Sequence, residues 1–119
     1  MAGPHQGLGR LLRAFAHTGL GLRAAWCHEA AFRQEILLAV ILTPVALWLG
    51  QSAVERVLLV TSLILVLIVE LLNTGLEAVV DRIGPERHEL SGRAKDMGSA
   101  AVFLACLNAL LTWFVLLFL

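Results

Sequence analysis

The sequence predicts an all-α membrane protein, a single domain over residues 1–119 in which an N-terminal amphipathic surface helix precedes three membrane-spanning helices. Apolar residues make up 59% of the chain and its mean hydropathy is +0.83, whereas soluble domains average roughly 45–50% apolar residues. A soluble core of this size could not bury so many aliphatic side chains. Long uncharged runs and a one-sided distribution of Lys and Arg complete the pattern.

The first predicted element is the surface helix, over about residues 7–34. Apolar residues recur there at near-helical spacing, namely Leu8, Leu11, Leu12, Phe15, Leu22 and Trp26. Arg10 and His17 lie on other faces, and we expect Gly19 and Gly21 to bend the helix. The second half carries too many charges for lipid, so it should rest at the interface.

The first two spans follow this helix. One is predicted over about residues 35–49, an uncharged run that is short unless the helix begins before it. Pro44 is tolerated there because packed neighbours satisfy the carbonyl that it leaves free. A tight turn at residues 50–52 leads into the second span, over about residues 54–83, which the Gly-Pro pair at 84–85 ends.

The third span is predicted over about residues 97–119, after a helical approach at 89–96. Cations gather in two segments, before the first span and between the second and third, namely Arg10, Arg13, Arg23, Arg33, Arg82, Arg87, Arg93 and Lys95. Loops rich in Lys and Arg stay in the cytosol. The N-terminus is therefore predicted to be cytosolic and the C-terminus to face outward.

Charge and cysteine spacing argue against other classes. The formal net charge is zero and no basic run occurs, so nucleic acid is not a predicted partner. Cys27 and Cys106 lie far apart and lack metal-ligand spacing, so both are predicted to be free thiols.

A stripe of polar residues lies inside the second span. On a helix that advances about 100° per residue, Asn73 and Glu77 fall at about −60° and −20° from Glu70, and Asp81 follows at about +20°. Glu70 is the deepest of the four, about 20 Å from the outer end of the span. A carboxylate at that depth costs at least about 2.5–3.5 kcal/mol on insertion scales, so it needs a partner or a purpose.

The stripe has a structural and a functional interpretation. Buried carboxylates can make interhelical hydrogen bonds that fix an oligomer, or they can act on a substrate. Further polar groups are expected at the same membrane level, namely Glu29, Glu35, Glu89, Lys95 and Asp96. Carboxylates without thiolates suit Mg²⁺, which is commonly bound by substrate phosphates as well. The deep Glu70 suits a general base that acts on a lipid hydroxyl. Because no Walker A, GxGxxG or kinase catalytic-loop motif occurs, these patterns alone predict a membrane enzyme or a carrier.

Six motifs together resemble one known family. They are GLRAAW at 21–26, EAAFRQE at 29–35, VE at 69–70, LN at 72–73, EAVVDRIG at 77–84 and HELSGRAKDMGSAAV at 88–102. In nearly gapless register they resemble the prokaryotic integral-membrane diacylglycerol kinase of Gram-negative inner membranes. The resemblance covers almost the whole chain, and the last motif is long and unusual in composition.

The resemblance implies a homotrimeric helical bundle with active sites shared between subunits at the cytosolic face of the bacterial inner membrane, with a periplasmic C-terminus. It implies transfer of the γ-phosphoryl of MgATP to the hydroxyl of 1,2-diacylglycerol, which gives phosphatidic acid and ADP. Glu70 would be the catalytic base, and Glu29 and Glu77 would bind Mg²⁺. Asn73 would support that site.

The resemblance also implies two sets of substrate contacts. ATP would be bound by Arg10, His17, Glu29, Glu77, Glu86, Arg87, His88, Lys95 and Asp96. The lipid would lie along Ala14, Arg23, Trp26, Ala31, Glu35, Trp48, Arg56, Glu70, Ser99 and Trp113. His17, Leu20, His28 and Arg87 stand where familiar members carry Tyr, Lys, Asn and Tyr, which leaves the nucleotide contacts at His17 and Arg87 open.

Two alternative functions remain at this point. An undecaprenol kinase would phosphorylate a polyprenyl alcohol on a similar scaffold. A small carboxylate-based proton or cation carrier would use the intramembrane acids as an ion pathway, but it would not require Lys95 and Asp96 beside Glu29.

Overall fold

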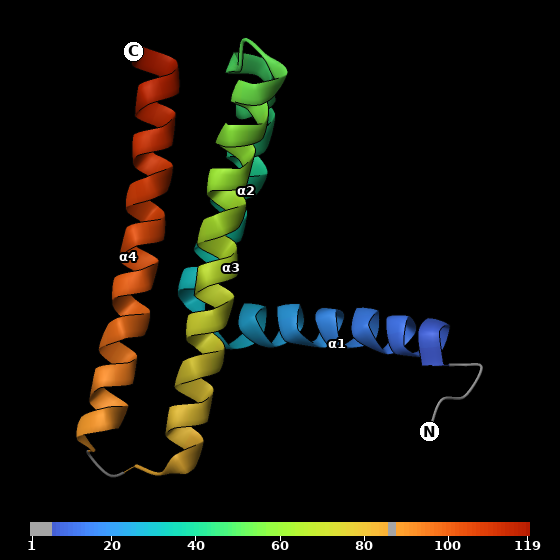
Figure 1. The fold of residues 1–119 in the computed structure, drawn as a ribbon, viewed down its shortest axis with the longest axis vertical. Coiled ribbons are helices and arrows are strands. Elements are labelled where there is room, and N and C mark those ends of the chain that lie inside the picture. Colours follow the sequence, from blue (N-terminus) through green and yellow to red (C-terminus); the bar gives the residue numbers. More distant parts are fainter. Residues whose placement is uncertain (1–5, 86–87) are drawn as a thin grey trace.

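The computed structural model describes residues 6–85 and 88–119, which form four helices. They are α1 (Gln6–His28), α2 (Ala30–Leu49), α3 (Ala53–Ile83) and α4 (Glu89–Phe118). The last three lie along a common axis, each antiparallel to the one before it, and α3 packs against both α2 and α4. Helix α1 projects sideways from the start of α2 (Figure 1). Each of α2, α3 and α4 is long and apolar enough to cross a membrane, which agrees with the prediction of three helices of spanning length.

One helix boundary and one expected break differ from the prediction. The helix break falls at Glu29, whose φ of −122° and ψ of 110° are extended, so residues 30–34 belong to α2 and not to the surface helix. The first span thereby gains a full length of 20 residues, about 30 Å, which removes the shortness of its uncharged run. Gly19 and Gly21 do not break α1, because a single glycine costs a helix only about 1 kcal/mol.

Side-chain caps fix the joint between α2 and α3. The Ser52 hydroxyl accepts a hydrogen bond from the Glu55 amide at 3.1 Å, which satisfies a free donor at the start of α3. Arg56 Nε donates to the Leu47 carbonyl at 3.0 Å, at the end of α2. The predicted turn at residues 50–52 is therefore held from both sides.

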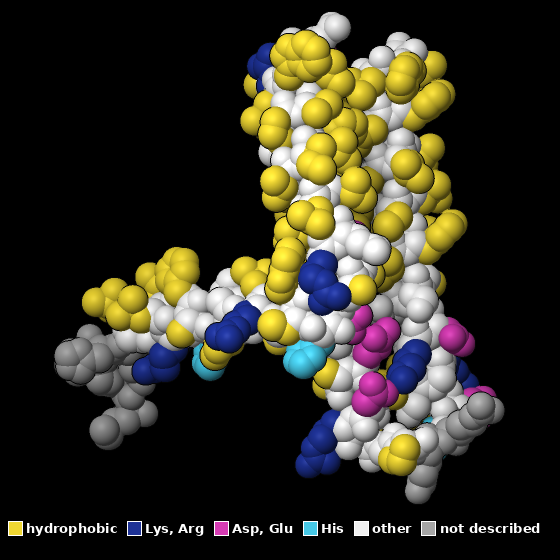
Figure 2. Space-filling model, turned by 180° about the vertical axis from the view of Figure 1, so that it is seen from behind, with side chains coloured by type: hydrophobic (Ala, Val, Ile, Leu, Met, Phe, Trp, Pro, Cys, Tyr) yellow, Lys and Arg dark blue, Asp and Glu magenta, His cyan; other side chains and the backbone are white. Residues whose placement is uncertain are grey.

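Apolar side chains cover most of the bundle surface. Large apolar residues stay exposed along all three spans, and the buried apolar set is small, namely Ala25, Phe32, Ala46, Leu59, Val66, Val80 and Ala105. Figure 2 shows apolar side chains over the upper part of the bundle, and acidic and basic side chains gathered mainly at the lower end and along α1. This separation is what a membrane protein requires, because lipid can cover the apolar part. The position of α1 on the membrane surface stays a prediction.

Trp113 links α4 to α3. Its indole Nε1 donates to the Leu59 carbonyl at 3.2 Å and to the Ser62 hydroxyl at 3.1 Å. Because Ser62 is buried, we expect Trp113→Phe to lower the free energy of unfolding by about 0.5–1.5 kcal/mol. Thermal unfolding in detergent measures this loss. Trp48→Phe is the control, since Trp48 is 82% exposed, and equal stability of both variants would contradict the assignment.

Candidate functional site

The polar stripe lies on α3 and faces the inside of the bundle. Glu70 is 6% exposed, and Asn73 and Glu77 are half-buried. Asn73 Nδ2 donates to Glu77 Oε1 at 3.3 Å, which holds the two side chains one turn apart on one face. Asn73 Oδ1 is buried without a hydrogen-bond partner among the residues described, so the amide has capacity for a further donor.

Glu35 of α2 meets Glu70 of α3. The two carboxyl groups are close enough to interact electrostatically, and Glu35 Oε2 is buried without a hydrogen-bond partner among the residues described. The pair thus places two carboxyl groups from different helices close together inside the bundle.

A cavity of about 630 Å³ opens where α1 meets α3. Its polar lining consists of Thr18, His28, Glu29, Thr74, Glu77 and Asp81. Figure 2 shows acidic side chains gathered in this region. The cavity brings together Glu29 from the α1–α2 joint and Glu77 from α3, the two carboxylates predicted to bind Mg²⁺.

The carboxylates that line the cavity would suit a hard divalent cation whose remaining ligands come from a substrate. Among residues 6–85 and 88–119, no three His, Cys, Asp or Glu side chains form a group that could hold a metal ion. Mg²⁺ is commonly held by one or two carboxylates, with water and substrate phosphates at the remaining positions. Glu29 and Glu77 match that donor set, because both offer oxygen ligands to one open cavity.

Lys95 lies at the polar end of the bundle between two cavities. Its Nζ pairs with Asp81 Oδ1 at 2.8 Å, and both side chains are largely exposed. Asp81 lines the first cavity, whereas Lys95 lines a second one of about 470 Å³ together with His88, Glu89 and Gly92. An exposed pair of this kind is weakly held, so the ammonium remains available to an anionic ligand.

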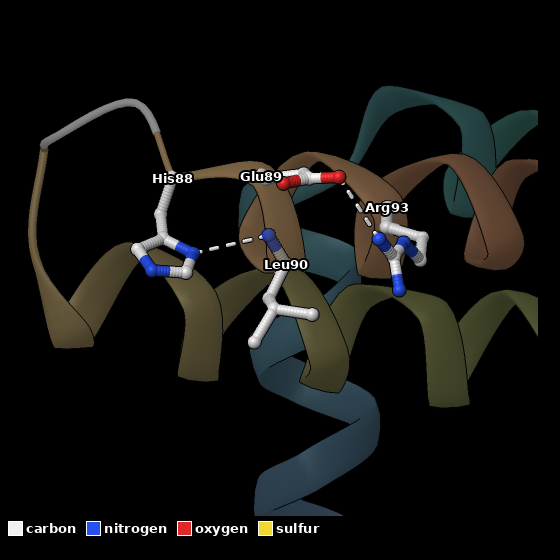
Figure 3. A network of polar contacts seen from close by, with 4 residues as sticks. All are labelled: His88, Glu89, Leu90 and Arg93. Atoms are coloured by element: carbon white, nitrogen blue, oxygen red, sulfur yellow. Dashed lines mark hydrogen bonds and ion pairs between the residues drawn. The ribbon is translucent and has the colours of Figure 1, made fainter.

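His88 begins α4 and caps it. Its Nδ1 accepts a hydrogen bond from the Leu90 amide at 3.0 Å, and Arg93 pairs with Glu89 at 3.0 Å one turn along (Figure 3). The cap occupies Nδ1 and leaves Nε2 to face other groups. Glu86 and Arg87, which were predicted beside it, lie outside the described residues.

The other predicted site residues fall into separate groups. Trp26 and Ala31 lie near the joint between α1 and α2, and Asp96 and Ser99 lie on the first turns of α4. Arg10, Ala14, His17 and Arg23 lie along α1, which projects away from the bundle, so Arg10 is about 27 Å along the helix from the joint (Figure 1). Trp48 and Arg56 lie at the opposite end of the bundle. Arg56 precedes Glu70 by 14 residues on α3, about 21 Å. A single chain therefore does not bring Trp48 and Arg56 to Glu70. The indole of Trp113 donates a hydrogen bond to the Leu59 carbonyl of α3.

Gly98 of α4 shapes the site and was missed in the sequence. A Cβ at this position would collide with Asn73 Oδ1 and lie 3.2 Å from Leu76 Cδ2. Gly98 is buried, so only a residue without a side chain leaves room for Asn73. The sole signal in the sequence is a small residue opposite a polar one, which becomes informative once the packing of α4 on α3 is known.

We expect Gly98→Ala to cost about 1–3 kcal/mol of stability through overpacking, or to push Asn73 away from Glu77. Thermal unfolding and the Mg²⁺ dependence of activity measure the two effects. Gly92→Ala on the same helix is the matched control, because nothing lies within 4 Å of the position that its methyl group would take. Unchanged values in both measurements for Gly98→Ala would contradict the close packing.

The fold is that of a membrane-spanning helical bundle, with the buried Glu70 inside it and a polar cavity that Glu29 and Glu77 line. The family described as prokaryotic diacylglycerol kinase matches residues 16–117. The chain belongs to this family, which confirms the resemblance seen in its motifs.

Three relatives illustrate the similarity, and each is named diacylglycerol kinase, a kinase that acts on an alcohol group. The protein of Escherichia coli K12 is 55% identical over 117 residues, covering 98% of this chain and 96% of its own. The Pseudomonas aeruginosa protein is 51% identical over 111 residues, covering 93% and 90%. That of Haemophilus influenzae is 48% identical over 112 residues, covering 94% and 95%.

Proposed function

We propose that this protein transfers the γ-phosphoryl group of MgATP to the hydroxyl of 1,2-diacylglycerol at the cytosolic face of the bacterial inner membrane. The observation that carries the proposal is the buried Glu70, which lies near Glu35 in a helix apolar enough to cross a membrane, on the same face as the Asn73–Glu77 pair. The proton-accepting group is thus on the lipid side and the cation-binding groups are on the aqueous side. Family membership supports the same reaction.

The proposed reaction is an in-line transfer. The lipid hydroxyl oxygen attacks the γ-phosphorus, its proton passes to Glu70, and the bond between the γ-phosphorus and the bridging oxygen breaks to release ADP and phosphatidic acid. Glu35 would stabilise the protonated form of Glu70 after this transfer. Such transfers need little covalent chemistry from the protein, so positioning and charge neutralisation dominate.

Residues at the aqueous side would bind the nucleotide. Glu29 and Glu77 would hold Mg²⁺, which neutralises phosphate charge when bound, and Asn73 keeps Glu77 in place. Lys95 would leave Asp81 for a phosphate oxygen, because a polyphosphate offers it more negative charge than one carboxylate does. Asp96, His88 and the first half of α1 complete the proposed nucleotide site.

A homotrimer with shared sites is part of the proposal. Trp48, Arg56 and Trp113 were assigned to the lipid, yet one chain holds Trp48 and Arg56 at the end of the bundle far from Glu70. Long acyl chains that run along the spans, or residues supplied by a neighbouring subunit, would reconcile these assignments.

The test compares two lipid alcohols. Purified protein in vesicles with MgATP is expected to phosphorylate diacylglycerol, with undecaprenol and acceptor-free vesicles as the comparison. Phosphorylation of undecaprenol alone would overturn the substrate and keep the kinase class. Proton or cation flux across the vesicles, without ATP consumption on either lipid, would overturn the class.

A further inference from the structure

Arg33 lies at the joint where α1 turns into α2. α1 ends at His28, α2 begins at Ala30, and Glu29 is the single non-helical residue between them. Arg33 Nη1 reaches back across the joint and donates to the Trp26 carbonyl at 2.6 Å and to the Cys27 carbonyl at 3.5 Å. The last carbonyls of a helix have no partner within it and favour a cation. Arg33 supplies both a hydrogen-bond donor and a positive charge to the end of α1.

The direction of α1 depends strongly on this joint. α1 projects away from the bundle and has far fewer contacts with it than α2 or α4 (Figure 1). A membrane surface would fix the plane of α1, but it would not fix its direction within that plane. The Arg33 side chain, anchored in α2, therefore sets where the end of α1 lies.

The same contact keeps the Arg33 guanidinium from pairing with the Glu29 carboxylate. A Glu followed by an Arg four residues later is a favoured helical ion pair, yet no ion pair joins Glu29 and Arg33 among the residues that the structure describes. The guanidinium is bound to carbonyls instead, and the Glu29 carboxylate lines the cavity with Glu77. Arg33 thus directs its hydrogen bonds to the backbone and leaves Glu29 able to bind a cation.

We propose that Arg33 is a positioning residue that clamps α1 against α2 and holds the Glu29 carboxylate in the cavity for the nucleotide-bound metal ion. This inference rests on the proposed function, because it concerns the same metal site. It adds a residue that acts on the metal site through Glu29.

Two variants and two measurements test the clamp. Arg33→Met removes the donors, whereas Arg33→Lys keeps a cation that can reach one carbonyl. We expect Arg33→Met to weaken the binding of Mn²⁺·ATP by about tenfold or more, with the KM for diacylglycerol within about twofold of wild type. Amides of residues 22–28 should exchange with solvent about tenfold faster as the end of α1 frays. Arg33→Lys should restore most of both values.

Controls separate charge, structure and function. Arg93→Met removes an exposed cation that pairs with Glu89, and it should leave Mn²⁺·ATP binding unchanged. Arg56→Met removes the equivalent backbone contact at the far joint, and it should leave exchange in α1 unchanged. Mn²⁺·ATP binding is measured without a lipid. If the wild-type protein binds Mn²⁺·ATP but phosphorylates no lipid, the proposed reaction is wrong, and the binding measurement still tests the clamp.

The proposal is overturned if Arg33→Met binds Mn²⁺·ATP as wild type does. It is equally overturned if exchange in α1 rises while metal binding stays unchanged, because Arg33 would then be structural only. Absence of Mn²⁺·ATP binding to the wild-type protein would overturn the clamp and the metal site together.

Discussion

Glu70→Gln is expected to reduce the turnover of diacylglycerol by about 10²–10⁴-fold, the usual contribution of general acid–base catalysis. Glutamine has the same shape as glutamate, but its amide cannot take up the proton of the lipid hydroxyl. Glu70 is buried, so water cannot readily take over this role. Steady-state formation of phosphatidic acid at saturating MgATP measures the loss.

The Glu70 variant must remain folded and assembled for this result to count. We expect its thermal unfolding and its oligomeric state in detergent to match those of the wild-type protein. Glu55→Gln is a matched control that should keep full turnover, because Glu55 is a carboxylate in the first turn of the same helix, at the end opposite the proposed site. A Glu70→Gln protein that turns over diacylglycerol within about threefold of wild type would remove Glu70 from the base role, given the size of effect expected.

The second large effect is expected for Glu77→Gln. Loss of this carboxylate removes a hard anionic ligand from the cavity that Glu29 also lines. Changes to residues that only support metal ligands already weaken metal binding by about 10–100-fold, so we expect at least about tenfold weaker binding here. The concentration of free Mg²⁺ that gives half-maximal activity at saturating ATP measures it.

A control on the same helix isolates the metal effect. Glu55→Gln changes a carboxylate at the opposite end of α3, and its Mg²⁺ dependence should equal that of the wild type. If Glu77→Gln also leaves the Mg²⁺ dependence unchanged, then Glu77 is not a ligand, and its hydrogen bond with Asn73 is a structural contact only.

Much of the fold followed from the sequence, because lipid imposes a simple rule on each span. Long uncharged runs must be helical in a bilayer, so the number of spans and the shared face of Glu70, Asn73 and Glu77 could be predicted from one helix at a time. The boundary at Glu29 could not, since residues 30–34 have a charge pattern that suits either an interface helix or the start of a span. The extended backbone at Glu29 decides it.

Contacts between side chains on different helices could not be predicted from the sequence. The approach of Glu35 to Glu70 depends on how α2 and α3 are rotated about their axes, and no spacing within one helix encodes that rotation. The Lys95–Asp81 pair and the space that Gly98 leaves for Asn73 depend in the same way on the packing of α4 against α3. Asp81, the last residue of the predicted stripe, is exposed and paired with Lys95.

In the proposed site, one polar stripe divides into a base, Glu70, and a metal ligand, Glu77. Mn²⁺·ATP binding followed by electron paramagnetic resonance, together with lipid phosphorylation by the same samples, tests this division. We predict that Glu70→Gln binds Mn²⁺·ATP as tightly as wild type but phosphorylates almost no diacylglycerol, whereas Glu77→Gln loses Mn²⁺·ATP binding. Equal loss of Mn²⁺·ATP binding in both variants would show that the two carboxylates do not have separate roles.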